Sequence, residues 1–182
     1  MKRTVLGATA LAAAGIGLLA AGCGGSASGA AAATSGTETI TGTLKGTAAM
    51  ASNPVFHLAF RGPVNTTATF PLGSSPKNGQ TITFKTAAGN LAIVSGTSAS
   101  TQKLLSTSTC RFEFATTVPY TVSGAKSTGK FAGATGSGKA VVLLAGNLPK
   151  LTNGKCNTTS TAQPRASTVV STFRATGPLT LK

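Results

Sequence analysis

The segment Val55-Phe56-His57-Leu58-Ala59-Phe60-Arg61 alternates apolar and polar side chains with a period of two residues. Successive side chains of a β strand point to opposite faces, so this alternation predicts a strand with one buried face. Phe56, Leu58 and Phe60 lie on the buried face, whereas His57 and Arg61 are expected to face solvent.

Short segments of the same kind recur from Thr39 onward, separated by Gly, Pro and Asn. Thr and Val are abundant in them, as half-buried strands prefer. No stretch after the N-terminal segment shows a helical apolar period of 3.6 residues. We expect further strands at 81–85, 91–94, 110–115, 120–122, 140–144, 168–174 and 179–181, with turns at 71–73, 78–79, 89–90, 153–154 and 177–178.

Eight to ten short strands in about 140 residues predict an all-β domain. The fold class we expect is an antiparallel β-barrel of eight to ten strands, with a two-sheet β-sandwich as the alternative. Either arrangement protects the strand edges.

The N-terminal segment has the features of an export signal. Lys2 and Arg3 precede an uncharged stretch, 4–22, that is rich in Ala, Leu and Gly. A positive start, an apolar middle and small residues at the end are typical of a signal peptide, which is helical during export. The end of this segment, Leu19-Ala20-Ala21-Gly22-Cys23, resembles the lipobox of bacterial lipoproteins, although Leu is commoner than Ala at position 20. The resemblance implies that Cys23 is acylated and becomes the new N-terminus, and an ordinary cleaved signal is the alternative.

The domain organisation follows from this boundary. Residues 1–22 are expected to form the lipoprotein signal peptide and residues 39–182 a single barrel domain. Residues 23–38 comprise the lipidated Cys23 and a small, polar segment whose composition favours a flexible linker. The protein is therefore expected outside the cytoplasm, anchored to the bacterial cell membrane, or secreted if Cys23 is not acylated.

Two cysteines, Cys110 and Cys156, remain after Cys23 is set aside. An even number of remaining cysteines in an exported domain predicts one disulfide, which could stabilise the fold by about 4 kcal/mol. Cys110 alternates with Phe112 and Phe114, so all three side chains are expected to share the inward face of a strand.

Charge excludes several classes of function. The chain has 16 basic residues, no Asp and two acids, Glu38 and Glu113, which gives a net charge of +14. Paired-carboxylate catalysis needs acids that the chain lacks. A metal site is not indicated because there is no CxxC motif and His57 is the single histidine. We expect no cofactor.

The basic residues are scattered, with no run and no interleaved aromatic residues, so nucleic acid is not an expected partner. Anionic polymers of the cell envelope are a candidate partner. The alternative is a solvated surface whose lysines keep strand edges apart.

The stretch Ser127-Thr128-Gly129-Lys130-Phe131-Ala132-Gly133-Ala134-Thr135-Gly136-Ser137-Gly138 resembles a glycine-rich stretch of bacterial proteins similar to the allene oxide cyclase and dirigent barrels. The closing Gly177-Pro178-Leu179-Thr180-Leu181 resembles the last strand of such chains. The resemblance implies an eight-stranded antiparallel barrel with an apolar mouth. Its plant members cyclise a substrate or guide radical coupling in that cavity, and their acidic functional residues have no evident counterpart here. Only the fold is therefore carried over, with Phe131 pointing inward.

Two other motifs have simpler structural interpretations. Gly133-Ala134-Thr135-Gly136-Ser137-Gly138-Lys139 is similar to a phosphate-binding loop, but Ala140 stands where that motif needs Ser or Thr, and a strand follows instead of a helix. Arg111 and Glu113 are expected to form a surface ion pair. Glu113 becomes a catalytic candidate only if the strand has the opposite register.

The leading hypothesis is a lipid-anchored extracytoplasmic barrel that binds a small apolar ligand without catalysis. An isomerase or cyclase, and a structural cationic envelope protein, are the alternatives. The partners expected are the membrane through the lipid anchor, a small apolar ligand and anionic envelope polymers. The candidates for the cavity wall are Phe56, Leu58, Phe60, Phe84, Phe112, Phe114 and Phe131, with Tyr120 as core or cavity wall.

Overall fold

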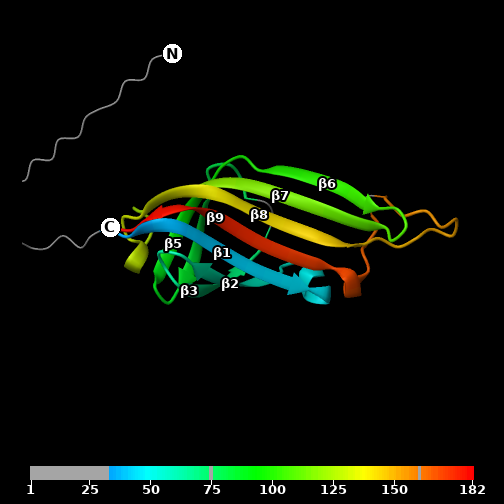
Figure 1. Ribbon diagram of the computed structural model, residues 1–182, viewed down its shortest axis with the longest axis horizontal. Coiled ribbons are helices and arrows are strands. Elements are labelled where there is room, and N and C mark those ends of the chain that lie inside the picture. Colours follow the sequence, from blue (N-terminus) through cyan, green and yellow to red (C-terminus); the bar gives the residue numbers. More distant parts are fainter. Residues whose placement is uncertain (1–32, 74–75, 160) are drawn as a thin grey trace, which may run out of the picture. The chain divides into compact units, whose positions relative to one another are not determined.

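The computed structural model describes residues 33–73, 76–159 and 161–182. These residues form nine β strands and three short 3-10 turns (Figure 1). No helix in this part of the chain is long and apolar enough to cross a membrane. The strands are β1 Ser35–Lys45, β2 Val55–Arg61, β3 Thr66–Pro71, β4 Thr81–Thr86, β5 Gly89–Ser95, β6 Ala99–Ser106, β7 Arg111–Val122, β8 Thr135–Asn147 and β9 Val170–Thr180, and the turns are η1 Gly46–Met50, η2 Gly129–Phe131 and η3 Ala166–Thr168.

The strands form a closed antiparallel barrel. They follow the order β5-β4-β3-β2-β1-β9-β8-β7-β6, and an additional pairing between β5 and β7 closes the ring. The closure pairs Ile93 with Val122, Val94 with Thr121 and Ser95 with Tyr120. Eight strands make the barrel and β6 lies outside the ring, which confirms the predicted barrel over the sandwich.

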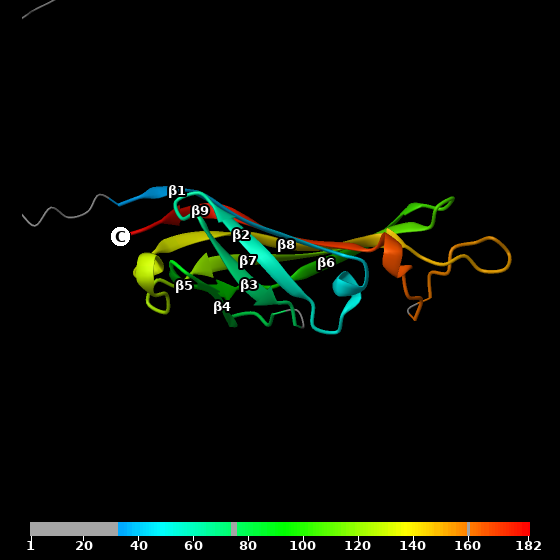
Figure 2. The ribbon, with the colours of Figure 1, turned by 90° about the horizontal axis from the view of Figure 1, so that it is seen from below.

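Four long strands continue beyond the closed ring as an open, curved sheet (Figures 1 and 2). β5 and β6 occupy different parts of the same edge of β7: β5 pairs near Val122, and β6 pairs with residues 111–117. β7, β8, β9 and β1 are 12, 13, 11 and 11 residues long, compared with six or seven for β2 to β5. The domain therefore has a closed barrel at one end and an open sheet, which does not close on itself, at the other.

The barrel interior holds the main apolar core. Phe56, Leu58 and Phe60 on β2 are fully or almost fully buried, whereas His57 is exposed, as the alternation predicts. Gly42 on β1 faces these residues, and a Cβ atom there would lie 2.8 Å from Leu58 and 3.2 Å from Phe56. The absence of a side chain at Gly42 lets β1 and β2 close over a core of large rings.

The glycine-rich segment seals one end of the barrel. Its turn η2 places Phe131, which is fully buried, into the core. The amide of Lys130 donates to the carbonyl of Ala88, so the segment is fastened to the β4–β5 hairpin. Gly89 and Gly129 meet there backbone to backbone, both at positive φ, and a Cβ on either would clash. The inward Phe131 is confirmed, as is the strand β8 in place of a nucleotide-binding helix.

Several strand boundaries differ from the sequence prediction. Gly177-Pro178 is not a turn but lies within β9, which is continuous to Thr180. No register pair joins Ser137 or Gly138 of β8 to this dipeptide, so Pro178, which lacks an N–H, lies where the β8–β9 ladder is interrupted. The β4–β5 turn is at 87–88, before Gly89-Asn90. The segments 111–115 and 120–122 belong to one strand, β7, whereas Cys110, predicted on the same strand, lies in the turn before it with a φ of 55°. Strands β1, β3 and β6 are not among the predicted ones.

β1 begins at Ser35, inside the segment 23–38 that the composition suggests as a linker. The predicted signal peptide, Cys23 and the linker up to residue 32 lie outside the described residues.

Candidate ligand-binding cavity

A cavity of about 320 Å³ lies in the barrel, beneath the connection between β3 and β4. Six strands contribute to its wall, and most of the side chains that line it are apolar. Its apolar lining includes Phe70, Phe84, Ile93, Val118, Val142 and Phe173.

One wall of this cavity is a cluster of tilted and edge-on aromatic rings. The ring centroid of Phe84 lies 5.0 Å from that of Phe70 and 6.2 Å from that of Phe173. Two further rings pack against this wall. The ring centroid of Phe60 lies 6.0 Å from that of Phe84, and the ring centroid of Phe56 lies 6.2 Å from that of Phe173. Tilted and T-shaped pairs at these distances are attractive beyond simple burial, by about 0.5–1.5 kcal/mol each. The wall is therefore a preformed aromatic surface.

The cavity opens to solvent through a gap in the barrel wall. β3 and β4 are joined at a single register pair, Ala68 with Thr86, whereas β2–β3 and β4–β5 each have six. The two strands separate from that point toward Pro71 and Thr81. Exposed residues such as Gln80 and Thr83 form the rim. A small molecule can thus reach the aromatic wall without the barrel unfolding.

Tyr120 on β7 brings a hydroxyl group to this otherwise apolar interior. Its side chain is buried and lines the cavity beside Val118. Gly138 is its partner on β8, and a Cβ atom there would lie 2.6 Å from the Tyr120 hydroxyl oxygen. The missing side chain at Gly138 therefore makes the room that the phenol occupies.

Glu38 on β1 is buried in the barrel with 4% of its surface exposed. Its Oε2 accepts a hydrogen bond of 3.1 Å from the amide of Val64, while Oε1 has no partner among the described residues. Burial raises the pKa of this carboxyl above its ordinary value, and the backbone amides of Val64 and Arg61 oppose that rise. Glu38 is thus a buried carboxyl group with one oxygen that accepts no hydrogen bond from the described residues.

Glu38 and Tyr120 both line a second, small cavity of about 10 Å³ toward the sealed end. Such a volume corresponds to about one water molecule. Burial raises the pKa of Tyr120, and the negative charge of Glu38 raises it further. Because Tyr120 lines both cavities, its phenol links the apolar cavity to the buried carboxyl.

The residues predicted for the cavity wall fall into three groups. Phe84 lines the cavity itself, as does Tyr120. Phe56, Leu58, Phe60 and Phe131 belong to the same core but pack behind the cavity. The remaining two, Phe112 and Phe114, lie outside the closed barrel.

Phe112 and Phe114 share the inward face of β7 with Tyr120, but at the end where β7 has left the barrel. They line a separate groove of about 460 Å³ on the open sheet, covered by the segment that follows β8. Phe112 packs with Cys110 and Leu148 in a small core of its own. Phe112 is buried as predicted, whereas Phe114 is 38% exposed. Residues on one face of a long strand need not share a cavity.

Cys110 and Cys156 form the predicted disulfide, with their Cα atoms 5.3 Å apart. A disulfide indicates an oxidising environment.

The surface ion pair predicted between Arg111 and Glu113 does not form in the described part of the chain, although the two side chains share one face of β7. Within the same residues, no three His, Cys, Asp or Glu side chains gather as metal ligands would.

Glu38 is the site residue that the sequence prediction missed. It falls in the predicted linker, and the acid considered for a barrel site is Glu113, in the opposite register of its strand. The signal was present in Thr37-Glu38-Thr39-Ile40-Thr41, where alternate Thr residues mark an outer face and leave Glu38 inward with Ile40. Phe70 and Phe173 were also missed as cavity wall. The chain matched no protein-family model, no curated protein and no solved structure.

Proposed function

We propose that this barrel binds a small, uncharged apolar molecule in its aromatic cavity. The observation that carries the proposal is the cavity of about 320 Å³, walled by Phe70, Phe84 and Phe173 and open between β3 and β4. Ligand pockets typically enclose roughly 300–1,000 Å³ with few polar groups, so this cavity suits a ligand at the small end of that range. The aromatic wall favours a flat or ring-containing ligand.

The phenol of Tyr120 would orient such a ligand. It is the polar side chain that reaches deep into the cavity, because Gln80, Thr81 and Thr83 are near the rim. A ligand with one carbonyl or hydroxyl group could hydrogen-bond to Tyr120 while its hydrocarbon part lies against the rings.

A fluorescence titration with N-phenyl-1-naphthylamine tests the proposal. This probe is neutral, so attraction to a chain of net charge +14 does not drive its binding. The chain has no Trp and a single Tyr, Tyr120, which lines the cavity. Bound probe should brighten saturably with one site per chain and should quench Tyr120 emission by energy transfer.

Two matched variants locate the bound probe. Val142→Phe fills the cavity from β8, and we expect it to weaken probe binding at least about tenfold, since the ring occupies ligand space. Val141→Phe makes the same change one residue earlier, on the opposite face of the strand, and should leave binding unchanged. Equal binding by both variants, or no saturable binding by the native chain, would contradict the proposal and favour a structural envelope role.

A second candidate is an isomerase or cyclase activity on the bound molecule. The observation that favours it is Glu38, a buried carboxyl with one oxygen unpartnered among the described residues, which meets Tyr120 at the small cavity while Tyr120 also lines the ligand cavity. Such a pair could move a proton at a carbon next to a carbonyl group. Deuterium exchange into cyclohexanone, followed by NMR, should then be faster with the native chain than with Glu38→Gln, and equal rates would remove this candidate.

We also propose that the domain works outside the cytoplasm, tethered to the membrane through an acylated Cys23. The disulfide and the sequence of residues 1–23 support this location. In a bacterial host the native chain should enter the detergent phase on detergent partition, and Cys23→Ser should move it to the aqueous phase. A native chain that stays aqueous would contradict the lipid anchor and indicate a secreted protein.

A further inference from the structure

Two hairpin tips at the end of the open sheet present exposed apolar side chains. One tip joins β6 to β7 and carries Leu104 and Leu105, and the other is the small hairpin 150–156, which carries Leu151. These leucines are 41%, 50% and 44% exposed, and nearby Phe114 is 38% exposed. They are four of the five large apolar side chains exposed in the described residues. We name the three leucines, with the basic residues beside them, the tip surface.

The disulfide holds the two tips together. Cys110 ends the β6–β7 turn and Cys156 ends the hairpin that carries Leu151. The carbonyl of Thr107 in the first tip lies 3.3 Å from the sulfur of Cys156, and the amide of Leu148 donates to the carbonyl of Cys110. The leucines of both tips are therefore presented as one rigid surface.

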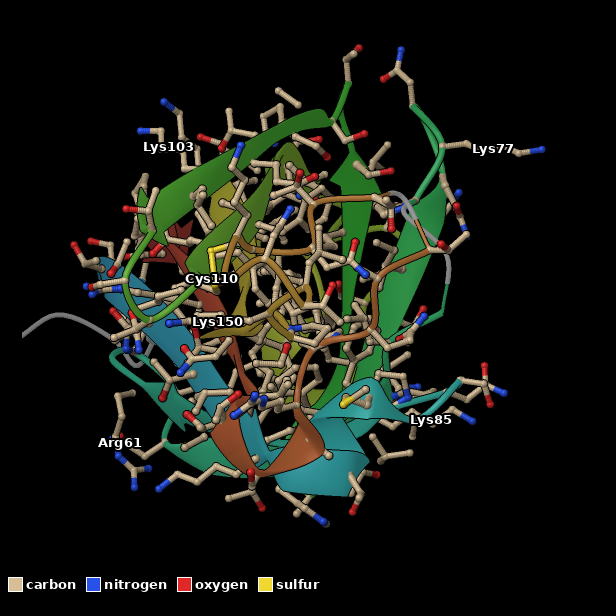
Figure 3. All side chains as sticks on the ribbon, turned by 90° about the vertical axis from the view of Figure 1, so that its right-hand side faces the viewer. Arg61, Lys77, Lys85, Lys103, Cys110 and Lys150 are labelled. Atoms are coloured by element: carbon tan, nitrogen blue, oxygen red, sulfur yellow. A yellow bond between two sulfur atoms is a disulfide. The ribbon has the colours of Figure 1, made fainter. Side chains whose placement is uncertain are left out.

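Basic side chains flank these leucines. Lys103 precedes Leu104, and Lys150 and Lys155 stand on the two sides of the Leu151 turn. Figure 3, which looks at this end of the sheet, shows Lys103 and Lys150 near Cys110, whereas Lys77 and Lys85 project from the opposite side. Arg111 is exposed in the same region, and Glu113, paired with Lys103 across the strands, is the acid nearby.

We propose that the tip surface docks on an anionic lipid bilayer. Exposed leucines between lysines match the boundary of such a membrane, because the leucines can enter the acyl region while the ammonium groups stay at the phosphates. A second copy of the chain fits less well, since it would bring lysines against lysines at the β6 edge. This surface is separate from the aromatic cavity, so a result that contradicts one proposal leaves the other unaffected.

Hydrogen–deuterium exchange of the full chain with vesicles tests the proposal. With vesicles that contain phosphatidylglycerol, we expect amides of residues 103–110 and 150–156 to exchange about tenfold more slowly when about nine-tenths of the chains are docked. Pure phosphatidylcholine vesicles should give no such slowing, and residues 77–85 should be unaffected by either.

Matched variants separate the contributions of the leucines and lysines. Leu105→Ser with Leu151→Ser should abolish the slowing, whereas Val55→Ser, the fifth exposed apolar residue, should not. Lys150→Gln with Lys155→Gln should reduce it, and Lys77→Gln with Lys85→Gln should leave it intact. Exchange at residues 107–112 and 148–157 without vesicles reports that the tips of each variant are folded.

Three results would overturn the proposal. Equal protection by neutral and anionic vesicles would show that the lysines are irrelevant. Protection by soluble polyphosphate alone would show that the surface binds polyanions without a bilayer. Slowing at residues 99–106 that depends on protein concentration without vesicles would show self-association along β6.

Discussion

Glu38 shows how one residue can alter the chemistry of an apolar barrel. It alternates with Ile40 on β1, so the strand itself carries the carboxyl inward. The Val64 amide satisfies one oxygen and the other has no partner in the described residues. The ionised form is therefore costly in the folded state, and a neutral carboxylic acid is favoured more than in solvent.

The stability of the domain should depend on pH through Glu38. Its pKa is raised in the folded state, so its contribution to stability is fully present below the unfolded pKa, near 4.5, and is lost as pH rises through the folded pKa. The stability of the native chain relative to Glu38→Gln should therefore increase when pH is lowered from 7 to 4. Thermal melts of both chains across this range measure the difference.

Glu113→Gln is the matched control for this measurement. Glu113 lies partly exposed on β7, outside the barrel. Because Glu38 is still present in this variant, Glu113→Gln should keep the pH dependence that Glu38 gives the native chain. A constant difference between the native chain and Glu38→Gln would contradict the account of Glu38 as a desolvated carboxyl.

At the scale of elements, strand length decides what each residue does. The seven residues of β2 lie within the barrel, so the alternation of Phe56, Leu58 and Phe60 could be interpreted directly as core. β7 has 12 residues and takes part in both halves of the domain. Its period-two pattern predicts the shared face of Phe112 and Tyr120, but the neighbour that covers each one follows from the pairing of β5 and β6 along its edge.

The disulfide should stabilise the open sheet more than the barrel. It closes a loop of 46 residues, for which the chain-entropy model gives about 4 kcal/mol. It belongs to the small core of Cys110, Phe112 and Leu148, apart from the core of the barrel. Cys110→Ser with Cys156→Ser should lower the melting temperature and speed amide exchange around residues 107–112 and 148–157 first.

Exchange in β2 to β5 should stay slow in that double variant at temperatures below its melt. Equal acceleration throughout the chain would contradict the independence of the two cores. The native chain under reducing conditions provides a second measurement without any substitution.

At the scale of the whole molecule, the closed barrel makes an internal cavity possible without a large core. Small residues dominate the chain, and the eight Phe residues provide most of the bulk. Phe84, Phe70 and Phe173 come from three strands and meet because the sheet closes. The space beside them is kept open because Ala140 and Val142 face it from β8.

A ligand of this cavity should stabilise the folded barrel. A molecule present at about 100 times its Kd adds about 2.7 kcal/mol to the free energy of unfolding. N-phenyl-1-naphthylamine should therefore raise the melting temperature of the native chain and of Val141→Phe, but not that of Val142→Phe. A rise in all three would indicate binding outside the cavity.

The amino-acid sequence by itself determined the all-β class, the inward faces of β2 and β4, and the pairing of the two cysteines, and it favoured an antiparallel barrel over a sandwich. These features follow from local alternation, turn residues and cysteine count, which neighbouring residues in the chain display. The tertiary structure alone decided the cavity, the inward Glu38 beside Tyr120, and the separation of Phe112 and Phe114 from the barrel. Those features depend on which strands pair and where the pairing stops, as at the single register pair between β3 and β4. Pairing between strands far apart in the chain cannot be inferred from the local alternation of residues.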